Sequence, residues 1–216
     1  MTGATSGCRE IVVASGNPHK VEEIRAILGP CGFRVLALSD VGGGSIPEPI
    51  EDGDSFAANA RIKAVAYARA LRSTVIADDS GLEVDALGGA PGIFSARWAG
   101  LGSTRTERDA ANNAKLVAAM AAVPDGRRTA RFLCAMCLCD SSGTVLAETT
   151  GAFEGTIARA PAGAHGFGYD PFLLVDGGTR SSAELLPEEK NARSHRGAAA
   201  RAMARVIEAT DCARSS

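Results

Sequence analysis

Residues 74–81 read TVIADDSG, a short run of strand character that leads directly into two adjacent carboxylates. The pattern predicts a strand over Thr74–Ala77 that ends at Asp78 and Asp79, with the Ser-Gly pair beginning a turn. In α/β proteins ligand clefts form at the ends of strands, so a site is expected here. Adjacent residues of a strand point to opposite faces, so only one of the two carboxylates should reach a ligand directly.

Segments of strand and helix character alternate on both sides of this stretch. Asn17 can cap a helix that Pro18 begins, Ser55 can cap a second, and Thr106 with Asp109 resembles a capping box for a third. We predict helices over about 18–28, 56–71, 106–123 and 194–210, and strands over 11–14, 33–38, 74–77, 129–139, 144–153 and 171–175. This mixed order predicts an α/β protein with parallel and antiparallel strand pairs.

Composition narrows the class of protein. A chain of 216 residues, 45% of them hydrophobic, fits one large domain or two lobes that share a sheet. The formal net charge of −2 argues against a nucleic-acid coat or a polybasic membrane binder. No apolar run approaches the roughly 18–20 residues that cross a bilayer, and no secretory signal is recognisable. We therefore expect no membrane and no nucleic-acid partner.

The six cysteines form no recognisable disulfide or zinc framework. Cys134, Cys137 and Cys139 lie in one apolar strand, with the last two on one face and Cys134 on the other. A second pair of zinc ligands is missing. Buried, reduced thiols in a cytoplasmic protein are the favoured interpretation. The sequence leaves open the exposure of Cys8, Cys31 and Cys212.

The segment SGNPHK, Ser15 to Lys20, leads from a strand through a glycine turn into a helix N-terminus. Free backbone N–H groups and the helix dipole at such a start favour an anion, and the lysine adds a positive charge. An ordinary capped helix explains the same residues, and the pattern of a Walker A loop is absent.

Two further clusters of polar residues could contribute to a site. Glu51 precedes Asn59 and Lys63, which share one face of the second predicted helix. Asp78 and Asp79 offer the oxygen ligands that Mg²⁺ prefers. A solvated polar helix face and a turn that favours Asp are the alternatives.

The C-terminal third contributes an aromatic turn and a basic cluster. In GFGYDP (166–171) two glycines bracket a ring, which lets backbone and ring approach a flat ligand. Lys190, His195 and Arg196 surround the start of the last predicted helix, where positive side chains oppose the helix dipole. A surface turn and a basic stripe are the alternatives. Together the motifs describe a nucleoside triphosphate site assembled from most of the chain.

These residues resemble the noncanonical purine nucleoside triphosphate pyrophosphatases, also called inosine triphosphatases or, in bacteria, dITP/XTP pyrophosphatases. The resemblance runs from about Ile11 to Ala209. It rests, in order, on SGNPHK (15–20), FxxNAxxKA (56–64), ADDSGLEVDALGGAPGIFSARWAG (77–100), GFGYDPF (166–172) and EKNARSHRG (189–197).

The resemblance implies a two-lobed α/β fold on a long, curved mixed β-sheet flanked by helices, with the active-site cleft between the lobes. It implies a single catalytic domain over residues 1–216, with an ordered core of about 9–210, and a homodimer. The implied reaction is Mg²⁺-dependent hydrolysis of ITP, dITP and XTP to the monophosphate and pyrophosphate.

Site roles also follow from the resemblance. The residues implied to bind the triphosphate are Ser15, Gly16, Asn17, Pro18, His19, Lys20 and Lys63, with Ser80 touching the substrate. Those implied to hold the base and sugar are Phe167, Gly168, Tyr169 and Asp170, with Lys190, His195 and Arg196 closing over the purine. Glu51 and Asp79 would bind Mg²⁺, and Asp79 would accept a proton with Asp78 in support.

The chemistry of the reaction agrees with these residue types. Attack on the α-phosphorus places charge on phosphate oxygens, so positioning and charge neutralisation are the main requirements. A carboxylate can orient and deprotonate water. Arg196 can only donate, which favours a 6-oxo purine and leaves the 6-amino group of adenine unmatched, at a cost of roughly 1–3 kcal/mol. The exclusion of guanine has no sequence signal.

Three positions depart from the family pattern. Ala58 replaces a common Glu and loses an accessory contact, Phe153 stands where Trp is frequent, and His165 replaces a small residue at the rim of the base pocket. A pyrophosphatase of other modified nucleotides, such as a Maf-like enzyme, and a nucleotide-binding module without turnover are the alternatives. An aspartyl-phosphate mechanism is disfavoured because the two acids are adjacent.

Overall fold

The computed structural model describes residues 9–214, and the side chains among them up to residue 210. A mixed sheet of seven strands runs through this part of the chain in the order β2-β1-β3-β4-β5-β6-β7. β1 pairs in parallel with β2 and β3, and the remaining neighbours pair antiparallel. The strands are β1 (Arg9–Val13), β2 (Phe33–Ala37), β3 (Val75–Val84), β4 (Thr129–Cys139), β5 (Val145–Ile157), β6 (Leu173–Val175) and β7 (Arg180–Ser181).

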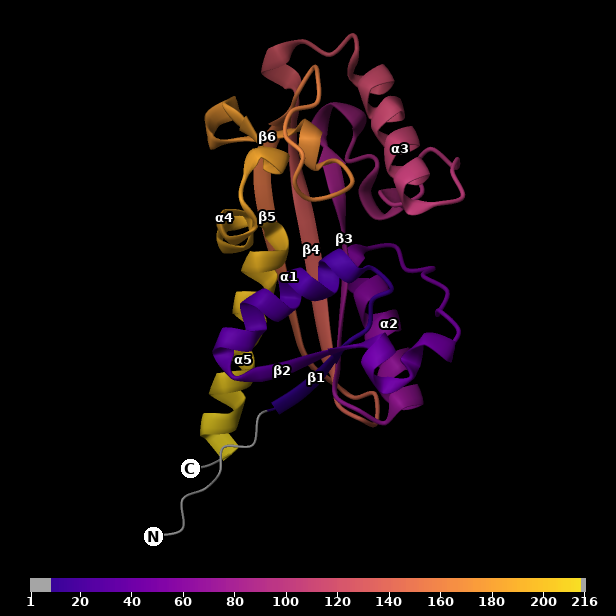
Figure 1. Ribbon diagram of the computed structural model, residues 1–216, viewed down its shortest axis with the longest axis vertical. Helices are drawn as coiled ribbons and strands as arrows, with labels where there is room; N and C mark the ends of the chain where they lie inside the picture. Colours follow the sequence, from indigo (N-terminus) through magenta and orange to yellow (C-terminus); the bar gives the residue numbers. More distant parts are fainter. Residues whose placement is uncertain (1–8, 215–216) are drawn as a thin grey trace.

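Helices cover both faces of the sheet. They are α1 (Pro18–Leu28), α2 (Phe56–Leu71), α3 (Arg105–Met120), α4 (Pro187–Arg193) and α5 (His195–Arg214). Figure 1 shows the long strands β3, β4 and β5 running through both halves of the molecule, with α1, α2 and α5 around one half and α3 beside the other. The expectation of an α/β fold with two lobes on one mixed sheet is confirmed.

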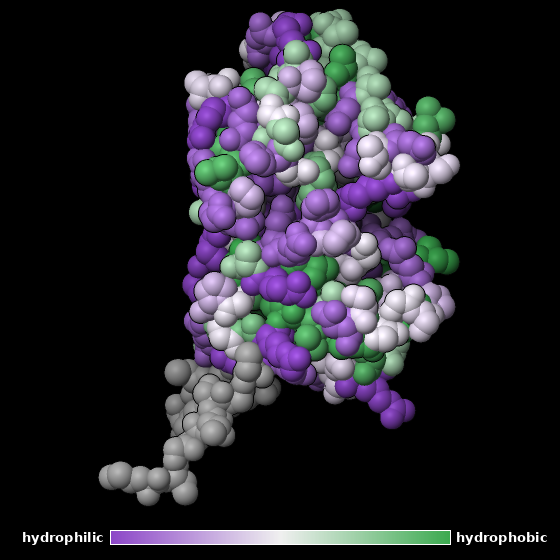
Figure 2. All heavy atoms as spheres, viewed as in Figure 1, coloured by the Kyte–Doolittle hydropathy of each residue, from purple (hydrophilic) through white to green (hydrophobic). Residues whose placement is uncertain are grey.

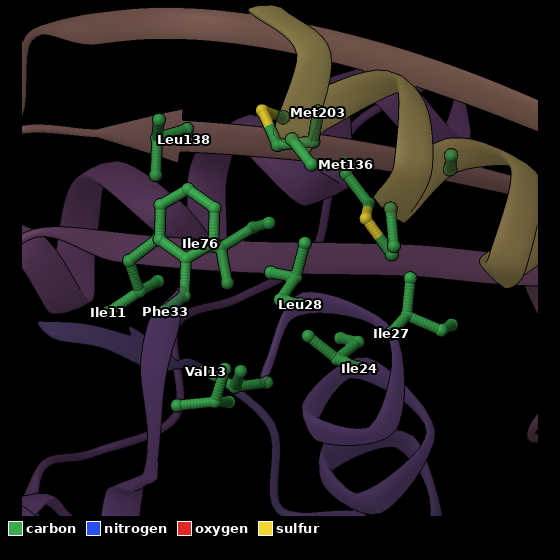
Figure 3. Packing of buried hydrophobic residues seen from close by; sticks show 14 of the residues in the cluster. Ile11, Val13, Ile24, Ile27, Leu28, Phe33, Ile76, Met136, Leu138 and Met203 are labelled. Carbon is green, nitrogen blue, oxygen red and sulfur yellow. The ribbon is translucent and has the colours of Figure 1, made fainter. Parts of the chain in front are cut away.

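Alternate residues of the central strands face different helix layers, as the two-residue period of a strand requires. Ile76 and Met136 pack beneath α1 and α5, in the cluster drawn in Figure 3. Ala77 and Cys137 pack on the opposite face beneath α2. A third cluster, which includes Leu82 and residues of α3, forms the core of the other half.

The predicted end of the strand at the two carboxylates is wrong. β3 continues through Asp78 and Asp79 to Val84, and every one of its residues is aligned with a residue of β4. Asp78 lies opposite Met136 and Asp79 opposite Ala135. The strand tolerates two adjacent acids because each has basic or amide partners on its own face of the sheet. Only the three-dimensional structure brings those partners into place.

The start of α3 also differs from the prediction. The capping box is formed by Thr104 and Glu107, two residues before the predicted pair of Thr106 and Asp109. Because residues with hydroxyl and carboxylate side chains recur along this segment, either pair fits the sequence pattern of a capping box. The helix ends at Met120 rather than near Val123.

The C-terminal elements are more divided than predicted. The expected strand over 171–175 is reduced to β6, because Asp170–Phe172 forms a 3-10 turn, and β7 was not predicted. Pro187–Arg193 forms the short helix α4, where no helix was predicted. On α5, Met203 is buried, whereas Val206 is 39% exposed.

The cysteines of β4 alternate as predicted. Cys134 belongs to the cluster beneath α1 and α5, and Cys137 and Cys139 belong to the cluster beneath α2. These three and the partly buried Cys31 are free thiols. Cys8 and the side chain of Cys212 lie outside what the structure describes. Within the described chain, no helix combines the length and apolar character needed to cross a membrane.

A buried arginine holds α3 to the sheet. The guanidinium of Arg128 donates to the carbonyl oxygens of Met120 and Val123, at the end of α3, at 2.8 and 3.1 Å. It also donates to those of Ile157 and Ala158, at 2.7 and 3.1 Å. Arg128 thereby supplies charged donors to backbone carbonyls at the end of a helix and at the end of a strand, where regular backbone hydrogen bonding stops.

Replacing Arg128 by Met should therefore lower the free energy of unfolding by about 2–4 kcal/mol, because buried carbonyl groups lose charged donors. The measurement is urea denaturation of the variant. Arg127→Met is the matched control, since Arg127 is exposed, and should stay within about 0.5 kcal/mol of the unsubstituted protein. Equal stabilities of the two variants would contradict this role.

Candidate active site

A cleft of about 370 Å³ lies where the two halves of the molecule meet. Its walls come from the β1–α1 turn, the segment before α2, β3, the segment 93–97, α3, the turn 167–170 and the start of α5. Figure 2 shows hydrophilic residues gathered across this waist of the molecule. The cleft therefore joins segments from most of the chain, as the sequence motifs suggested.

The two carboxylates of β3 point to opposite faces, as predicted for neighbours in a strand. Asp78 is buried on the face of α1 and α5, where Lys20 Nζ lies 3.0 Å and Arg196 Nη2 3.1 Å from its Oδ2. Burial alone would raise the pKa of Asp78, but the charges of Lys20 and Arg196 hold it well below its usual range. Asp78 is thus a permanent anion that holds two cations, and it does not itself line the cleft.

Asp79 lines the cleft on the face of α2. Its carboxylate accepts from Asn59 Nδ2 at 3.2 Å and from Lys63 Nζ at 3.4 Å. Burial raises the pKa of Asp79, and the opposing charges of Lys63 and Lys20 do not fully offset it. A carboxylate with a raised pKa is suited to accept a proton.

Glu51 completes an oxygen-rich corner with Asp79. Lys63 Nζ lies 3.2 Å from Glu51 Oε2 and 3.4 Å from Asp79 Oδ1, so a positive charge already lies between the two carboxylates. The described residues contain no group of three or more His, Cys, Asp or Glu side chains able to hold a metal ion. Two carboxylates still fit Mg²⁺, which commonly takes its remaining ligands from water and substrate phosphates.

The start of α1 is capped as predicted. Asn17 caps the helix by accepting from the backbone N–H of His19 at 3.1 Å, and Pro18 occupies the first turn. The backbone N–H of Asn17 donates to Ser15 Oγ at 3.2 Å. Asn17 Nδ2 is buried and has no hydrogen-bond partner among the described residues, so a donor remains available at the helix N-terminus.

Phe167 contributes an aromatic ring to the cleft. Its ring stacks on His19 with centroids 5.5 Å apart, and Arg105, Lys190 and Arg196 lie 4.9–5.8 Å from its centroid. Cations around an aromatic ring stabilise a flat, electron-rich platform.

Asp170 fixes this turn. Its carboxylate accepts from the backbone N–H of Phe167 at 2.8 Å, from Ser182 Oγ at 2.9 Å and from Lys190 Nζ at 2.7 Å. The hydroxyl of Tyr169 donates instead to the carbonyl of Ser95 at 2.9 Å, so the Tyr169 ring braces the two walls of the cleft.

Arg196 is almost wholly buried, with 1% of its surface exposed. It pairs with Glu23 of α1 and donates to Ser80 Oγ at 2.8 Å. The neighbouring His195 stacks on Phe132 with centroids 5.0 Å apart. Burial, with Arg196 and Lys190 nearby, keeps the pKa of His195 well below its usual value, so its ring is neutral.

Most of the predicted site residues meet in this one cleft. Those that line it are Ser15, Gly16, Asn17, Lys20, Glu51, Lys63, Asp79, Ser80, Phe167, Gly168, Tyr169, Asp170, Lys190, His195 and Arg196. Pro18 and His19 do not line it, although His19 contacts Phe167. Of the departures, Ala58 and His165 also lie outside the lining, and Phe153 packs in the core of the α3 half.

The sequence analysis missed the wall that α3 and the segment before it supply. Arg97, Arg105, Arg108 and Asp109 all line the cleft. Glu23, which pairs with both Lys190 and Arg196, was also missed. The i, i+3 and i, i+4 spacing of Arg105, Arg108 and Asp109 was the available signal, but on an exposed helix it does not differ from an ordinary charged surface.

Comparison with known proteins shows which sequences and structures this chain is similar to. The model of the Ham1 family matches residues 11–206. A dITP/XTP pyrophosphatase of Streptomyces coelicolor is 47% identical over 197 residues, covering 91% of this chain and 96% of its own. The one of Corynebacterium efficiens is 44% identical, covering 92% and 97%. The structure of a HAM1 protein from Coxiella burnetii matches with a TM-score of 0.80 and 39% identity, over 93% and 98% of the two chains.

The opposite environments of the two carboxylates predict opposite effects on stability. Asp78→Asn should lower the free energy of unfolding at pH 7 by about 3–5 kcal/mol, because it leaves buried cations unpaired. Asp79→Asn, its matched control one residue away, should leave stability equal or higher, because it removes a buried charge. Urea denaturation in EDTA measures both.

The pH dependence follows from the directions of the shifts. Because the folded pKa of Asp78 is lowered, its stabilisation is present above the unfolded pKa and is lost as pH falls toward the folded value. The pKa of Asp79 is raised, so the destabilisation by its charge begins as pH rises past the unfolded pKa and is complete above the folded value. An Asp79→Asn variant less stable than Asp78→Asn at pH 7 would refute this description.

Proposed function

The chain belongs to the Ham1 family, and from this membership and the geometry of the cleft we propose that it hydrolyses deaminated purine nucleoside triphosphates. ITP, dITP and XTP are converted to the monophosphate and pyrophosphate. The observation that carries the proposal is the pair Asp79 and Lys63 in a cleft that the N-terminus of α1 and the ring of Phe167 also line. The N-terminus of α1 can hold a triphosphate, and the ring of Phe167 can hold a base.

We infer that Asp79 is the base that accepts a proton from the attacking water. Its raised pKa and its place in the cleft support this role. Asn59 and Lys63 orient its carboxylate. Asp78 acts through its partners, because it holds Lys20 toward the phosphates and Arg196 toward the base.

Glu51 and Asp79 would hold Mg²⁺. When bound, the ion neutralises charge on the phosphate oxygens at which the reaction occurs. Lys63, which now pairs with both carboxylates, would then be freed to contact a phosphate oxygen. Lys20 and the backbone N–H groups of Ser15–Lys20 would bind the same chain of phosphates.

We attribute the preference for a 6-oxo purine over adenine to two side chains that can donate hydrogen bonds but cannot accept them. Arg196 and Lys190 can donate to a 6-oxo group and cannot accept from the 6-amino group of adenine. Both are buried and held by carboxylates, so an unmatched amino group would not be rescued by water. Phe167 supplies the flat contact.

The remaining proposals concern organisation. One catalytic domain, a homodimer and a cytoplasmic location are consistent with the family match over residues 11–206 and with the free thiols. Phe94 and Leu101, which are 53% and 69% exposed, offer apolar surface for a second copy. Sedimentation at several concentrations tests the dimer, and a monomer throughout would reject it.

Product analysis tests the activity. With Mg²⁺, ITP and XTP should yield pyrophosphate with IMP or XMP at least about tenfold faster than ATP yields pyrophosphate, as one unmatched polar group predicts. GTP carries the same 6-oxo group as ITP, so its rate is measured beside the others to test selection at the 2-position. Orthophosphate plus a diphosphate would reject cleavage at the α-phosphorus. Equal turnover of all four would reject the base selection, and preferred turnover of modified pyrimidines would favour the alternative pyrophosphatase.

The role of Asp79 is tested by separating binding from turnover. Asp79→Asn should bind ITP within about threefold of the unsubstituted protein and lose at least 10²-fold in kcat, since general-base catalysis contributes that much. Calorimetry and pyrophosphate release are the two measurements. Normal turnover of Asp79→Asn would assign the base elsewhere.

A further inference from the structure

Seven cationic side chains line the cleft, and the carboxylates around them are nearly as numerous. Lys20 and Arg196 pair with Asp78. Lys63 pairs with Glu51 and Asp79, and Lys190 with Asp170. We call these four paired cations the floor of the cleft. Because carboxylates largely neutralise them, they have little positive charge left to offer a ligand.

Arg97 and Arg108 are different. Within the described chain, these are the two lining cations without an ion pair. Arg97 lies over the ring of Phe94 at 5.5 Å, and Arg108 donates to the backbone carbonyl of Ser103 at 3.0 Å. Both side chains are exposed to the cleft and retain free guanidinium donors.

The segment that carries Arg97 is tightly anchored. The Ser95 hydroxyl accepts from the backbone N–H of Leu82 at 2.9 Å and donates to the carbonyl of Gly92 at 2.6 Å. A Cβ on Gly81 would lie 2.2 Å from Ser95 Oγ, so only glycine lets the segment approach β3 this closely. Gly81 is two residues beyond Asp79, which places Ser95 on the same face of the sheet as Asp79.

Two neighbouring faces of α3 contact different segments of the chain. One face contacts the turn at Gly168, and the other contacts the segment that carries Arg97. Asp109 accepts from the backbone N–H of Gly168 at 3.2 Å, and Asn113 donates to its carbonyl at 3.0 Å. Arg105, which precedes Asp109 by four residues and so shares this face of the helix, lies over the ring of Phe167. These residues belong to the end of the cleft assigned to the base.

The neighbouring face of α3 packs on the segment that carries Arg97. Asn112 donates to the carbonyl of Ser95 at 3.1 Å and accepts from the backbone N–H of Ala99 at 2.8 Å. Arg108 is four residues before Asn112, so it lies one turn away on the same face, beside the segment of Arg97. The two unpaired arginines thus lie on one wall of the cleft that Asp79 and Lys63 also line, and the segment of Arg97 packs on β3 two residues beyond Asp79.

We propose that Arg97 and Arg108 bind the β- and γ-phosphates, the half of the substrate that leaves as pyrophosphate. This rests on the proposed function. A nucleoside triphosphate carries about four negative charges at neutral pH, more than the paired cations of the floor can match. Guanidinium groups suit phosphate because they donate two parallel hydrogen bonds.

The role extends to the bond that breaks. Water oxygen bonds to the α-phosphorus, its proton passes to Asp79, and the electron pair of the broken bond remains on the bridging oxygen of the β-phosphate. Arg97 and Arg108 would neutralise the charge that develops there, which lowers the barrier as well as binding the ground state. The two arginines come from the half of the molecule opposite α1 and α2, so the phosphates would be held between the two halves.

The test compares inhibition by the two products. In Arg97→Ala and Arg108→Ala, the inhibition constant of inorganic pyrophosphate against ITP hydrolysis should rise about tenfold or more, as loss of a charged hydrogen bond predicts. That of IMP should change less than twofold. Arg97→Lys and Arg108→Lys should recover part of the pyrophosphate affinity. Arg127→Ala removes the same charge from the exposed surface outside the cleft and should change neither constant.

Two outcomes would overturn the inference. Unchanged pyrophosphate inhibition would remove these arginines from the phosphate site, and equal loss of pyrophosphate and IMP affinity would indicate a distorted cleft. Calorimetric binding of Mg²⁺-pyrophosphate to the unsubstituted protein and to the two alanine variants gives the same comparison without turnover. Failure to release pyrophosphate from ITP or XTP would reject the proposed function, whereas the calorimetry would still decide the binding role.

Discussion

The buried carboxylate of Asp78 is the interaction on which the site depends. It lies in the middle of β3 and pairs with Lys20 from α1 and Arg196 from α5. Removing charges from water is costly, so this group is stable only when strand and both helices are in register. The same contact thus sets how the start of α1 and the start of α5 lie relative to each other beside β3.

Because the side chains of β3 alternate between the two faces of the sheet, its two neighbouring acids lie in different environments. Asp78 faces two cations, has a lowered pKa and remains an anion. Asp79 faces α2, keeps a raised pKa and is open to the cleft. One strand therefore carries a structural charge and a chemically available one, and the pleat keeps them apart. Close packing of α5 on β5 preserves this arrangement, because a Cβ on Gly151 would lie 2.2 Å from the carbonyl oxygen of His195.

The second wall of the cleft depends on polar anchors instead of apolar packing alone. Arg128 fixes the end of α3, while Asn112 and Ser95 join the middle of α3 to the segment beside β3. The exposed arginines of this wall are consequently presented from rigid backbone. This matters for phosphate binding, since a pre-positioned donor loses less entropy on meeting its ligand.

Sequence alone determined what depends on local chemistry. The cap at Asn17, the apolar stripe of α1, the hairpin of β4 and β5 and the opposite orientation of Asp78 and Asp79 follow from short-range geometry, and the quoted motifs identified the family. Only the tertiary structure decided that β3 continues through two acids, that Glu23 pairs with Arg196, and that Arg97 and Arg108 line the same cleft as Asp79. These features depend on partners far away in the chain, and Coulomb and desolvation energies are fixed only when the fold brings such partners within a few ångströms.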